Sequence, residues 1–337
     1  MGAQHSAPAA AQNPTLALAP LSDLFSHDAG ARLAPWLSLR TLHRLRAVSH
    51  IAREYAERVL SRMPRPVVIG GRGAGSMMHF DPTRLRWCSG GLDGSALARK
   101  SMDNVSATML PGGRIVTLTE IPYVPGKRTT RVSDPCADHY AVEVRAPAGP
   151  AGTWSTLFGT EYWRSQGGAA VALPDDRTVL LMGGARYEPT TDDEFMEPSV
   201  LRVDADGELP AEELSPMRQG RASFAAGLLN DGRVIVAGGW GNDADAIRRG
   251  APNPDLKLDH CEIYSPASDS WTEAAPMKHG RTHAAGCVTR TGLFVVVGGR
   301  AQAHANNGWA VGSQPPPEVF DPEQNAWSMF PSPSGRR

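Results

Sequence analysis

Histidine, cysteine and acidic residues offer this chain few arrangements that could carry out chemistry. His279 and His283 are four residues apart, a spacing that suits zinc on a helix. They precede a predicted strand, however, where alternate residues share a face. The acidic residues of segment 188–197 lack the spacing of a calcium-binding loop, and no G-x-S-x-G nucleophile motif is present. We therefore predict no catalytic residue, no metal site and no cofactor.

Three arginines are better suited to binding than to catalysis. Arg221 and Arg281 hold matching positions just before predicted strands, and Arg164 is a looser equivalent. A guanidinium group can clamp a carboxylate through two parallel hydrogen bonds. We predict that these arginines contact acidic groups of a partner. The alternative is a role in the fold, in which they donate hydrogen bonds to carbonyl groups between sheets.

Aromatic and basic residues also follow the paired glycines of the chain. Tyr187, Trp240 and Arg300 come directly or almost directly after such pairs, where long loops begin. Exposed Tyr, Trp and Arg side chains often anchor protein interfaces. We predict that these three residues belong to a binding face, with core packing as the alternative for Trp240.

A repeated pattern indicates which elements position these residues. A Gly-Gly pair ends an apolar run, and an aromatic residue then precedes a tryptophan by seven residues. The copies are 234–240 with Tyr264 and Trp271, 294–299 with Phe320 and Trp327, and a degenerate one at 70–71 with Phe80 and Trp87. A period of roughly 50–60 residues that holds several short strands is typical of β-propeller blades.

The repeat predicts a mainly β fold, a propeller formed by residues 64–330. We expect about five blades, the first of them incomplete. Pro331, Pro333 and Gly335 argue against a closing strand in the C-terminal tail, residues 331–337. The ring is therefore expected to close imperfectly, to be open, or to belong to a truncated product.

Residues 20–63 differ from the rest of the chain and predict a small helical module. Apolar residues recur every three or four positions from Leu42 to Met63, as on one face of a helix or of two successive helices. Pro64 and Pro66 end this pattern. Residues 1–19 are rich in Ala, Pro and Gln and are expected to form a disordered tail.

The composition limits the classes of partner and the cellular compartment that we expect for this chain. The formal net charge of −1 provides no basic field for nucleic acid, and no apolar run is long enough to span a membrane. The four cysteines are scattered and favour a reduced compartment, the cytoplasm or the nucleus. Residues 1–6 fit a myristoylation pattern, so acylation of Gly2 would add weak membrane association.

Two stretches of the propeller region carry a family resemblance. They are Pro216-Met217 with Arg221, 234–239, Tyr264 and Trp271, and again Pro276-Met277 with Arg281, 295–299, Phe320 and Trp327. In these residues the chain resembles the kelch-repeat family, which implies four-stranded blades around an axis and a protein or peptide ligand. A minority of such propellers are copper oxidases or sugar isomerases. The six tyrosines of this chain form no convincing copper-ligand set with His and Cys.

The helical module matches a second family pattern. Its matching residues are Pro20-Leu21, Leu24-Phe25, Leu33, Trp36-Leu37, Leu39, Leu42, Leu45 and the run 46–50. In these residues the module is similar to an F-box. Ala52 stands where that family has a closing tryptophan, and the leading Leu-Pro order is reversed. The alternative is a pair of helices that covers the open side of the propeller.

An F-box followed by a kelch propeller is the domain order of substrate receptors in SCF-type cullin–RING ubiquitin ligases. The resemblance implies a non-enzymatic adaptor, whose module binds the ligase adaptor subunit and whose propeller face binds a protein substrate. The expected adaptor contacts are Leu21, Leu24, Phe25, Leu33, Leu37, Leu42, Leu45 and Val48. The alternatives are a kelch scaffold without a ubiquitin role and, from another class, a galactose-oxidase-like or sugar-isomerase enzyme.

Overall fold

The computed structural model describes residues 37–62, 67–69, 71–74, 77–90, 101–102, 106–121, 139–145, 154–160, 167–188, 193–242, 256–301 and 314–330. Both predicted tails, Leu21, Leu24, Phe25, Leu33 and Arg164 lie outside these described residues. The chain divides into two compact units: Met1–Val68 with Met78–Ser89, and Ile69–Met77 with Gly90–Arg337.

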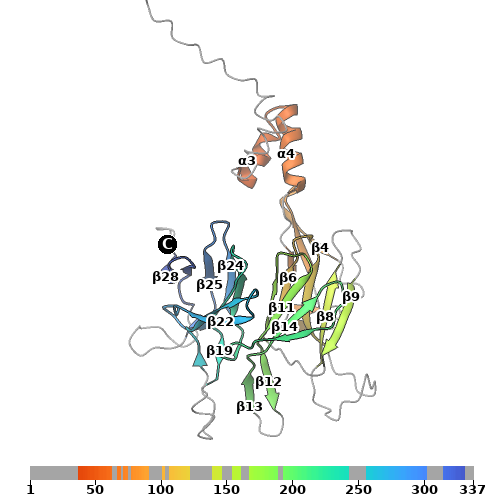
Figure 1. Ribbon diagram of the computed structural model, residues 1–337. Helices are drawn as coiled ribbons and strands as arrows, with labels where there is room; N and C mark the ends of the chain where they lie inside the picture. The colour runs from red at the N-terminus through yellow and green to blue at the C-terminus, as the bar shows by residue number, and fades with distance from the viewer. Residues whose placement is uncertain are drawn as a thin grey trace, which may run out of the picture. The chain divides into compact units, whose positions relative to one another are not determined.

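Two helices belong to the first unit, α3 (Leu39–Leu45) and α4 (His50–Arg62) (Figure 1). The Ser38 hydroxyl accepts a hydrogen bond from the Thr41 amide at 3.1 Å and so caps the start of α3. The helices pack against each other through the buried side chains of Leu42, Tyr55, Ala56 and Leu60. The helices expected before the propeller are therefore present.

A three-stranded sheet completes the first unit. Its strands are β1 (Val67–Ile69), β3 (Met77–Asp81) and β4 (Arg86–Gly90), in the order β1-β3-β4. The rings of Phe80 and Trp87 meet edge to face with centroids 5.4 Å apart. His43 of α3 contacts the Pro82 carbonyl through Nε2 at 2.8 Å, which ties the helices to the turn between β3 and β4.

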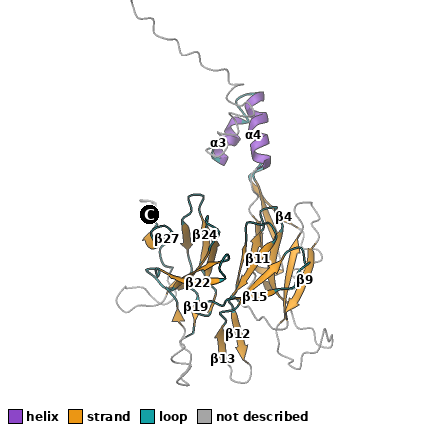
Figure 2. Cartoon of the chain, in the orientation of Figure 1, coloured by secondary structure: helices purple, strands orange, loops and turns teal. Residues whose placement is uncertain are grey.

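The second unit contains four four-stranded antiparallel sheets, in each of which the strands lie side by side in chain order (Figures 1 and 2). The β6–β9 blade consists of β6 (Ser106–Met109), β7 (Ile115–Ile121), β8 (His139–Arg145) and β9 (Trp154–Thr160). The β10–β15 blade consists of β10 (Ala169–Ala172), β11 (Thr178–Met182), β14 (Val200–Asp204) and β15 (Glu212–Leu214). The β17–β22 blade consists of β17 (Ala225–Leu228), β18 (Val234–Ala237), β21 (Cys261–Ser265) and β22 (Ser270–Ala274). The β24–β28 blade consists of β24 (Ala285–Val288), β25 (Phe294–Val297), β27 (Glu318–Asp321) and β28 (Ala326–Met329).

Short strands extend some blades beyond the paired glycines. They are β2 (Gly71–Ala74) with β5 (Ser101–Met102), β12 (Ala185–Glu188) with β13 (Asp193–Met196), β16 (Arg221–Ala222) with β19 (Trp240–Gly241) and β20 (Leu256–Lys257), and β23 (Arg281–Thr282) with β26 (Arg300–Ala301). The mainly β propeller is confirmed, with four four-stranded blades in the second unit where about five blades were expected. The strands expected to form the incomplete first blade, β1, β3 and β4, belong to the first unit.

Neighbouring blades share apolar cores and are joined by their tryptophans. The Trp271 indole nitrogen, on β22, donates to the carbonyl of Ser215 at 2.8 Å, just after β15 of the preceding blade. Trp327, on β28, donates in the same way to Ala275 at 2.8 Å, just after β22. Trp271 and Trp327 therefore fill the space between two sheets and satisfy their N–H groups on the neighbouring blade.

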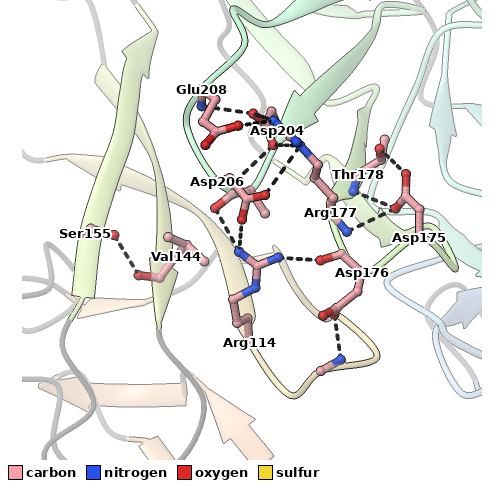
Figure 3. A network of polar contacts seen from close by, with 12 residues as sticks. Arg114, Val144, Ser155, Asp175, Asp176, Arg177, Thr178, Asp204, Asp206 and Glu208 are labelled. Carbon is pink, nitrogen blue, oxygen red and sulfur yellow. Dashed lines mark hydrogen bonds and ion pairs between the residues drawn. The ribbon is translucent and has the colours of Figure 1, made fainter.

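A polar network joins the β6–β9 and β10–β15 blades at their first turns (Figure 3). Arg114, just before β7, donates to the Asp176 carbonyl and to the Asp206 carboxylate. On the other side, Arg177 forks onto both oxygens of Asp204, at 2.7 and 2.8 Å. The Arg114 contacts therefore join the two blades, while the Arg177–Asp204 pair connects two turns of the β10–β15 blade.

Asp204 makes folding stability depend on acidity. Its hydrogen bonds with Arg177 hold the pKa of this carboxyl well below its usual range, because they favour the charged form. A carboxyl whose pKa is lower in the folded chain stabilises the fold above its unfolded pKa of about 3.9, and that stability is lost as the pH falls further. We expect the free energy of unfolding of the unmodified chain to fall more steeply than that of Asp204→Asn between about pH 5 and pH 2. Urea unfolding at stepped pH measures this, and parallel curves would contradict it.

Candidate functional site

Arg221 lies in the interior of the β17–β22 blade and does not reach a partner. Its side chain is 0% exposed and donates to the Gly238 carbonyl at 2.9 Å and the His260 carbonyl at 3.0 Å. It also forms an ion pair with Glu262 at 2.7 Å, and that carboxylate is 0% exposed as well. Burial lowers the pKa of the Arg221 guanidinium, and the facing Glu262 opposes the shift.

The β24–β28 blade repeats this arrangement. Arg281 is 1% exposed and pairs with the buried Glu318. The Glu318 carboxylate also accepts a hydrogen bond from the Lys278 amide at 2.7 Å, as Glu262 does from the Arg218 amide at 2.8 Å. The glutamates thus hold both the arginine and the turn before it.

The contacts correct the expectation that Arg221 and Arg281 clamp a partner. Their hydrogen-bonding groups face carbonyls and a carboxylate inside the blade, which is the alternative role in the fold. The sequence reasoning missed both glutamates. A signal was available, because Glu262 and Glu318 each stand two residues before the repeated aromatic residue.

Side chains that do reach the surface gather where the chain leaves the second strands of the last two blades. Trp240 is half-buried, and the Lys257 ammonium lies over its ring at 4.8 Å from the centroid. The exposed His283 ring meets Trp240 edge to face, with centroids 6.4 Å apart. Arg300 is exposed beside them. We call Trp240, Lys257, His283 and Arg300 the Trp240 patch.

Short strands hold the Trp240 patch in place. Trp240 on β19 pairs with Lys257 on β20, and Arg300 on β26 pairs with Thr282, the neighbour of His283. The His283 amide donates to the Ser223 carbonyl at 2.7 Å, which links two successive blades. Two of the patch residues were predicted from the sequence. Lys257 was missed because its strand follows a long loop, and His283 was considered only as a zinc ligand.

Lys257 and Arg300 bring two basic side chains to the Trp240 patch. Burial lowers the pKa of His283, and the charge of Arg300 lowers it further. Among the residues that the structure describes, no carboxylate lies within ion-pair distance of Arg300. The arrangement can therefore bind an aromatic or apolar group against Trp240 and an anionic group beside it.

Tyr187 lies on the neighbouring β12–β13 hairpin. Its backbone pairs with Glu194, and the hairpin is tied to β19 by Asn242, whose side-chain amide donates to the Met196 carbonyl at 2.9 Å. Figure 1 shows β12, β13 and β19 at the same lower end of the second unit. The structure thus brings the Tyr187 backbone to the end that carries the Trp240 patch.

The expected contact residues of the helical module differ in how exposed they are to solvent. Leu42 is 0% exposed in the core between α3 and α4, and Leu37 and Leu45 are half-buried against that core. The expectation that Leu42 contacts an adaptor is corrected, because the helices themselves cover it. Val48 is 63% exposed, and the neighbouring Ile51, which the sequence reasoning missed, is 46% exposed.

Other features of the described residues offer no competing site. No group of three or more His, Cys, Asp or Glu within them is arranged to hold a metal ion, and none of their helices is long and apolar enough to cross a membrane. A cavity of about 630 Å³ beside β14 and β15 is lined by both charged and apolar residues. Its arginines already pair with carboxylates of the same blade, Arg177 with Asp204 and Arg202 with Glu212.

Comparisons with known proteins agree with this fold. No model of a known protein family matches the chain. The F-box/kelch-repeat protein At2g44130 of Arabidopsis thaliana is 28% identical over 175 residues, which cover 49% of this chain and 38% of that protein. The F-box/kelch-repeat protein SKIP20 of Arabidopsis thaliana is 29% identical over 179 residues, with the same coverage of 49% and 38%. The chain thus spans well under half the length of these curated relatives.

A solved structure shows the same architecture. The structure of YjhT matches with a TM-score of 0.54 and covers 78% of this chain and 79% of that one. At 15% sequence identity this likeness concerns the fold alone. The resemblance of the chain to F-box/kelch-repeat proteins is confirmed by the curated relatives, and the kelch-type propeller by the structure.

Proposed function

We propose that this chain is a non-enzymatic adaptor, the substrate-recognition subunit of an SCF-type cullin–RING ubiquitin ligase. In this proposal the propeller holds a target protein through the Trp240 patch, and the helical module binds the ligase adaptor subunit. The observation that carries the proposal is a half-buried tryptophan grouped with basic side chains at the loop end of a propeller. It is supported by relatives that are named F-box/kelch-repeat proteins.

The chemistry of the Trp240 patch suits a protein target. Tryptophan and arginine are enriched among the residues that dominate binding energy at interfaces. Trp240 is already held by Lys257 and His283, so little side-chain entropy is lost when a partner covers it.

The junction between α3 and α4 suits a second partner. Val48 and Ile51 expose apolar side chains to water. Between them, the Ser49 hydroxyl accepts a hydrogen bond from the Ala52 amide at 3.1 Å, which caps the start of α4. Neighbouring exposed apolar side chains on a folded module indicate a protein contact.

The helical module can be tested without unfolding it. We expect the full chain to co-elute with the ligase adaptor subunit on size-exclusion chromatography, and Val48→Asp with Ile51→Asp to weaken this complex at least tenfold. Ser61→Asp, which places the same charge on an exposed position near the end of α4, is the matched control and should retain binding. Leu42→Asp is unsuitable, since it would disrupt the core between the helices. A chain that fails to co-elute contradicts the ligase role, whereas a double variant that binds normally contradicts the assignment of the contact to Val48 and Ile51.

The target face has its own test. We expect Trp240→Ala to lower the affinity for the captured target by about 2 kcal/mol or more, roughly thirtyfold in Kd. Phe330→Ala, which removes an aromatic ring that is 45% exposed outside the patch, should leave the affinity unchanged. If Trp240 is needed but the ligase adaptor never binds, the chain is a kelch scaffold without a ubiquitin role.

A further inference from the structure

We propose that the outer strand of the last blade, β28, pairs edge to edge with β28 of a second copy of this chain, in an antiparallel dimer centred on Ser328. β28 lies at the end of its sheet, in the order β24-β25-β27-β28. Within the part of the chain that the structure describes, no strand pairs with its outer edge. The inference goes beyond the proposed function, since neither the Trp240 patch nor the helical module takes part.

The outer strands of the other three blades carry features that block such pairing. β9 pairs with β8 through an irregular register at Val142 and Glu143, and a bulge of this kind twists a strand edge. β15 exposes Glu213, and β22 exposes Glu273. A carboxylate on an edge strand disfavours pairing because it would lose water. In a pair of identical strands it would also come close to its own copy, with the same charge.

β28 lacks these features. Its register with β27 is regular over all its residues, and its sequence contains no charged residue. Met329 pairs with Glu318 at the position where Glu273 pairs with Glu262 in the preceding blade. A methionine that is 36% exposed thus replaces the edge glutamate, and the next residue, Phe330, is 45% exposed. The edge of β28 is therefore both uncharged and partly apolar.

The backbone of β28 determines how a second copy would pair with it. The Phe330 amide donates to the Pro317 carbonyl at 2.9 Å, on the side of β27. Backbone groups of successive residues in an antiparallel sheet point alternately to the two neighbouring strands. The amide and carbonyl groups of Trp327 and Met329 therefore point to the outer edge. Pairing around Ser328 places Trp327 opposite Met329 of the second copy and satisfies these groups on both strands.

The side chains of β28 are complementary to themselves in this register. Directly opposite residues share a face of the sheet, so Met329 packs beside Trp327 of the second copy. On the other face, Phe330 lies opposite Ala326. Each contact occurs twice, because a two-fold dimer uses the same surface on both copies. The pairing thus covers the exposed apolar side chains at this edge of both chains.

Sedimentation equilibrium of the full chain tests the dimer. We expect the average mass to rise toward that of two chains as the concentration approaches about 100 µM, because the interface is small. Met329→Glu, which restores the edge glutamate of the preceding blades, should raise the Kd of the dimer by about tenfold or more. Thr272→Glu places the same charge on an exposed position of β22 and should leave the Kd unchanged.

Ser328→Cys provides a second measurement, which reports the register. In the proposed dimer the two copies of this residue lie opposite each other, with Cα atoms about 4.5 Å apart and within reach of a disulfide. Mild oxidation with diamide should link two Ser328→Cys chains. Thr272→Cys, on the same type of strand, and the unmodified chain with its four cysteines should stay unlinked.

The remaining outcomes decide against the inference. A chain that stays monomeric over this range overturns it, as does a dimer that Met329→Glu leaves intact or that Ser328→Cys fails to link. Both side chains are exposed, so both variants should unfold thermally like the unmodified chain at low concentration. Co-elution with the ligase adaptor subunit and target capture should not change in Met329→Glu, so the inference and the proposed function fail separately.

Discussion

Glu262→Leu should destabilise the propeller by about 3–5 kcal/mol, because it leaves the Arg221 guanidinium charged and unpaired in the interior. Arg221 and Glu262 are both 0% exposed, so water cannot replace the lost partner. Urea unfolding followed by tryptophan fluorescence measures the change. Glu273→Leu, on the strand directly opposite and 66% exposed, is the matched control and should change stability by no more than about 0.5 kcal/mol.

The double variant Arg221→Met with Glu262→Leu should be more stable than Glu262→Leu alone, because it removes both buried charges together. The chain contains its own precedent. Leu201 occupies the position in the β10–β15 blade that Glu262 occupies in the next blade. Each residue pairs across its sheet with the residue that stands two positions before the glycine pair. In the sequence, Ser165 takes the place of Arg221, because Ser165 precedes Gly167 by two residues as Arg221 precedes Ser223. A double variant as unstable as the single one would contradict the charge argument.

Phe294→Ala should cost about 3–5 kcal/mol, because a large buried ring is removed from the space between two blades. Phe294 is 0% exposed. It fills the room that Gly227 and Gly286 leave, since a Cβ at Gly286 would lie 2.7 Å from the ring and one at Gly227 would lie 3.0 Å from it. Thermal unfolding measures the loss, and Phe330→Ala, with a ring that is 45% exposed, should change little.

Gly286→Ala tests the same packing from the other side. The added methyl would overlap the Phe294 ring, and we expect a loss of about 1–3 kcal/mol from overpacking. The loss should shrink when Phe294→Leu makes room for the methyl. If Gly286→Ala is neutral alone, the blades are less tightly interleaved than the structure indicates.

Most of the fold could be predicted from the sequence because its signals are local and repeated. The paired glycines mark the bend after the second strand: Gly238 and Gly239 have φ values of 71° and 99°, in the left-handed region that favours glycine. The aromatic and tryptophan pair marks the outer strands, and Tyr264 does pair with Trp271 across β21 and β22. The short strands beyond the glycines carry no such signal, because two-residue pairings depend on partners distant in sequence.

The candidate site could be predicted only in part, because residue type does not reveal burial. Arg221, Arg281 and Arg300 read alike in the sequence, yet only Arg300 is exposed. The difference arises from Glu262 and Glu318, which are 41 and 37 residues away from the arginines they hold. Similarly, Leu42 and Val48 share one helical pattern, and the turn between the helices decides that the first is buried and the second exposed.

The tryptophan bonds between blades have a consequence for how the propeller loosens. Trp327 and the side chain of Asn325 both bind backbone groups of Ala275 in the preceding blade, so each sheet is anchored backwards along the chain. Coupling of this kind runs from nearest neighbour to nearest neighbour. Unfolding of the β24–β28 blade would leave the earlier blades folded. Unfolding of the β17–β22 blade would also remove the Ala275 groups to which Trp327 and Asn325 of the last blade bind.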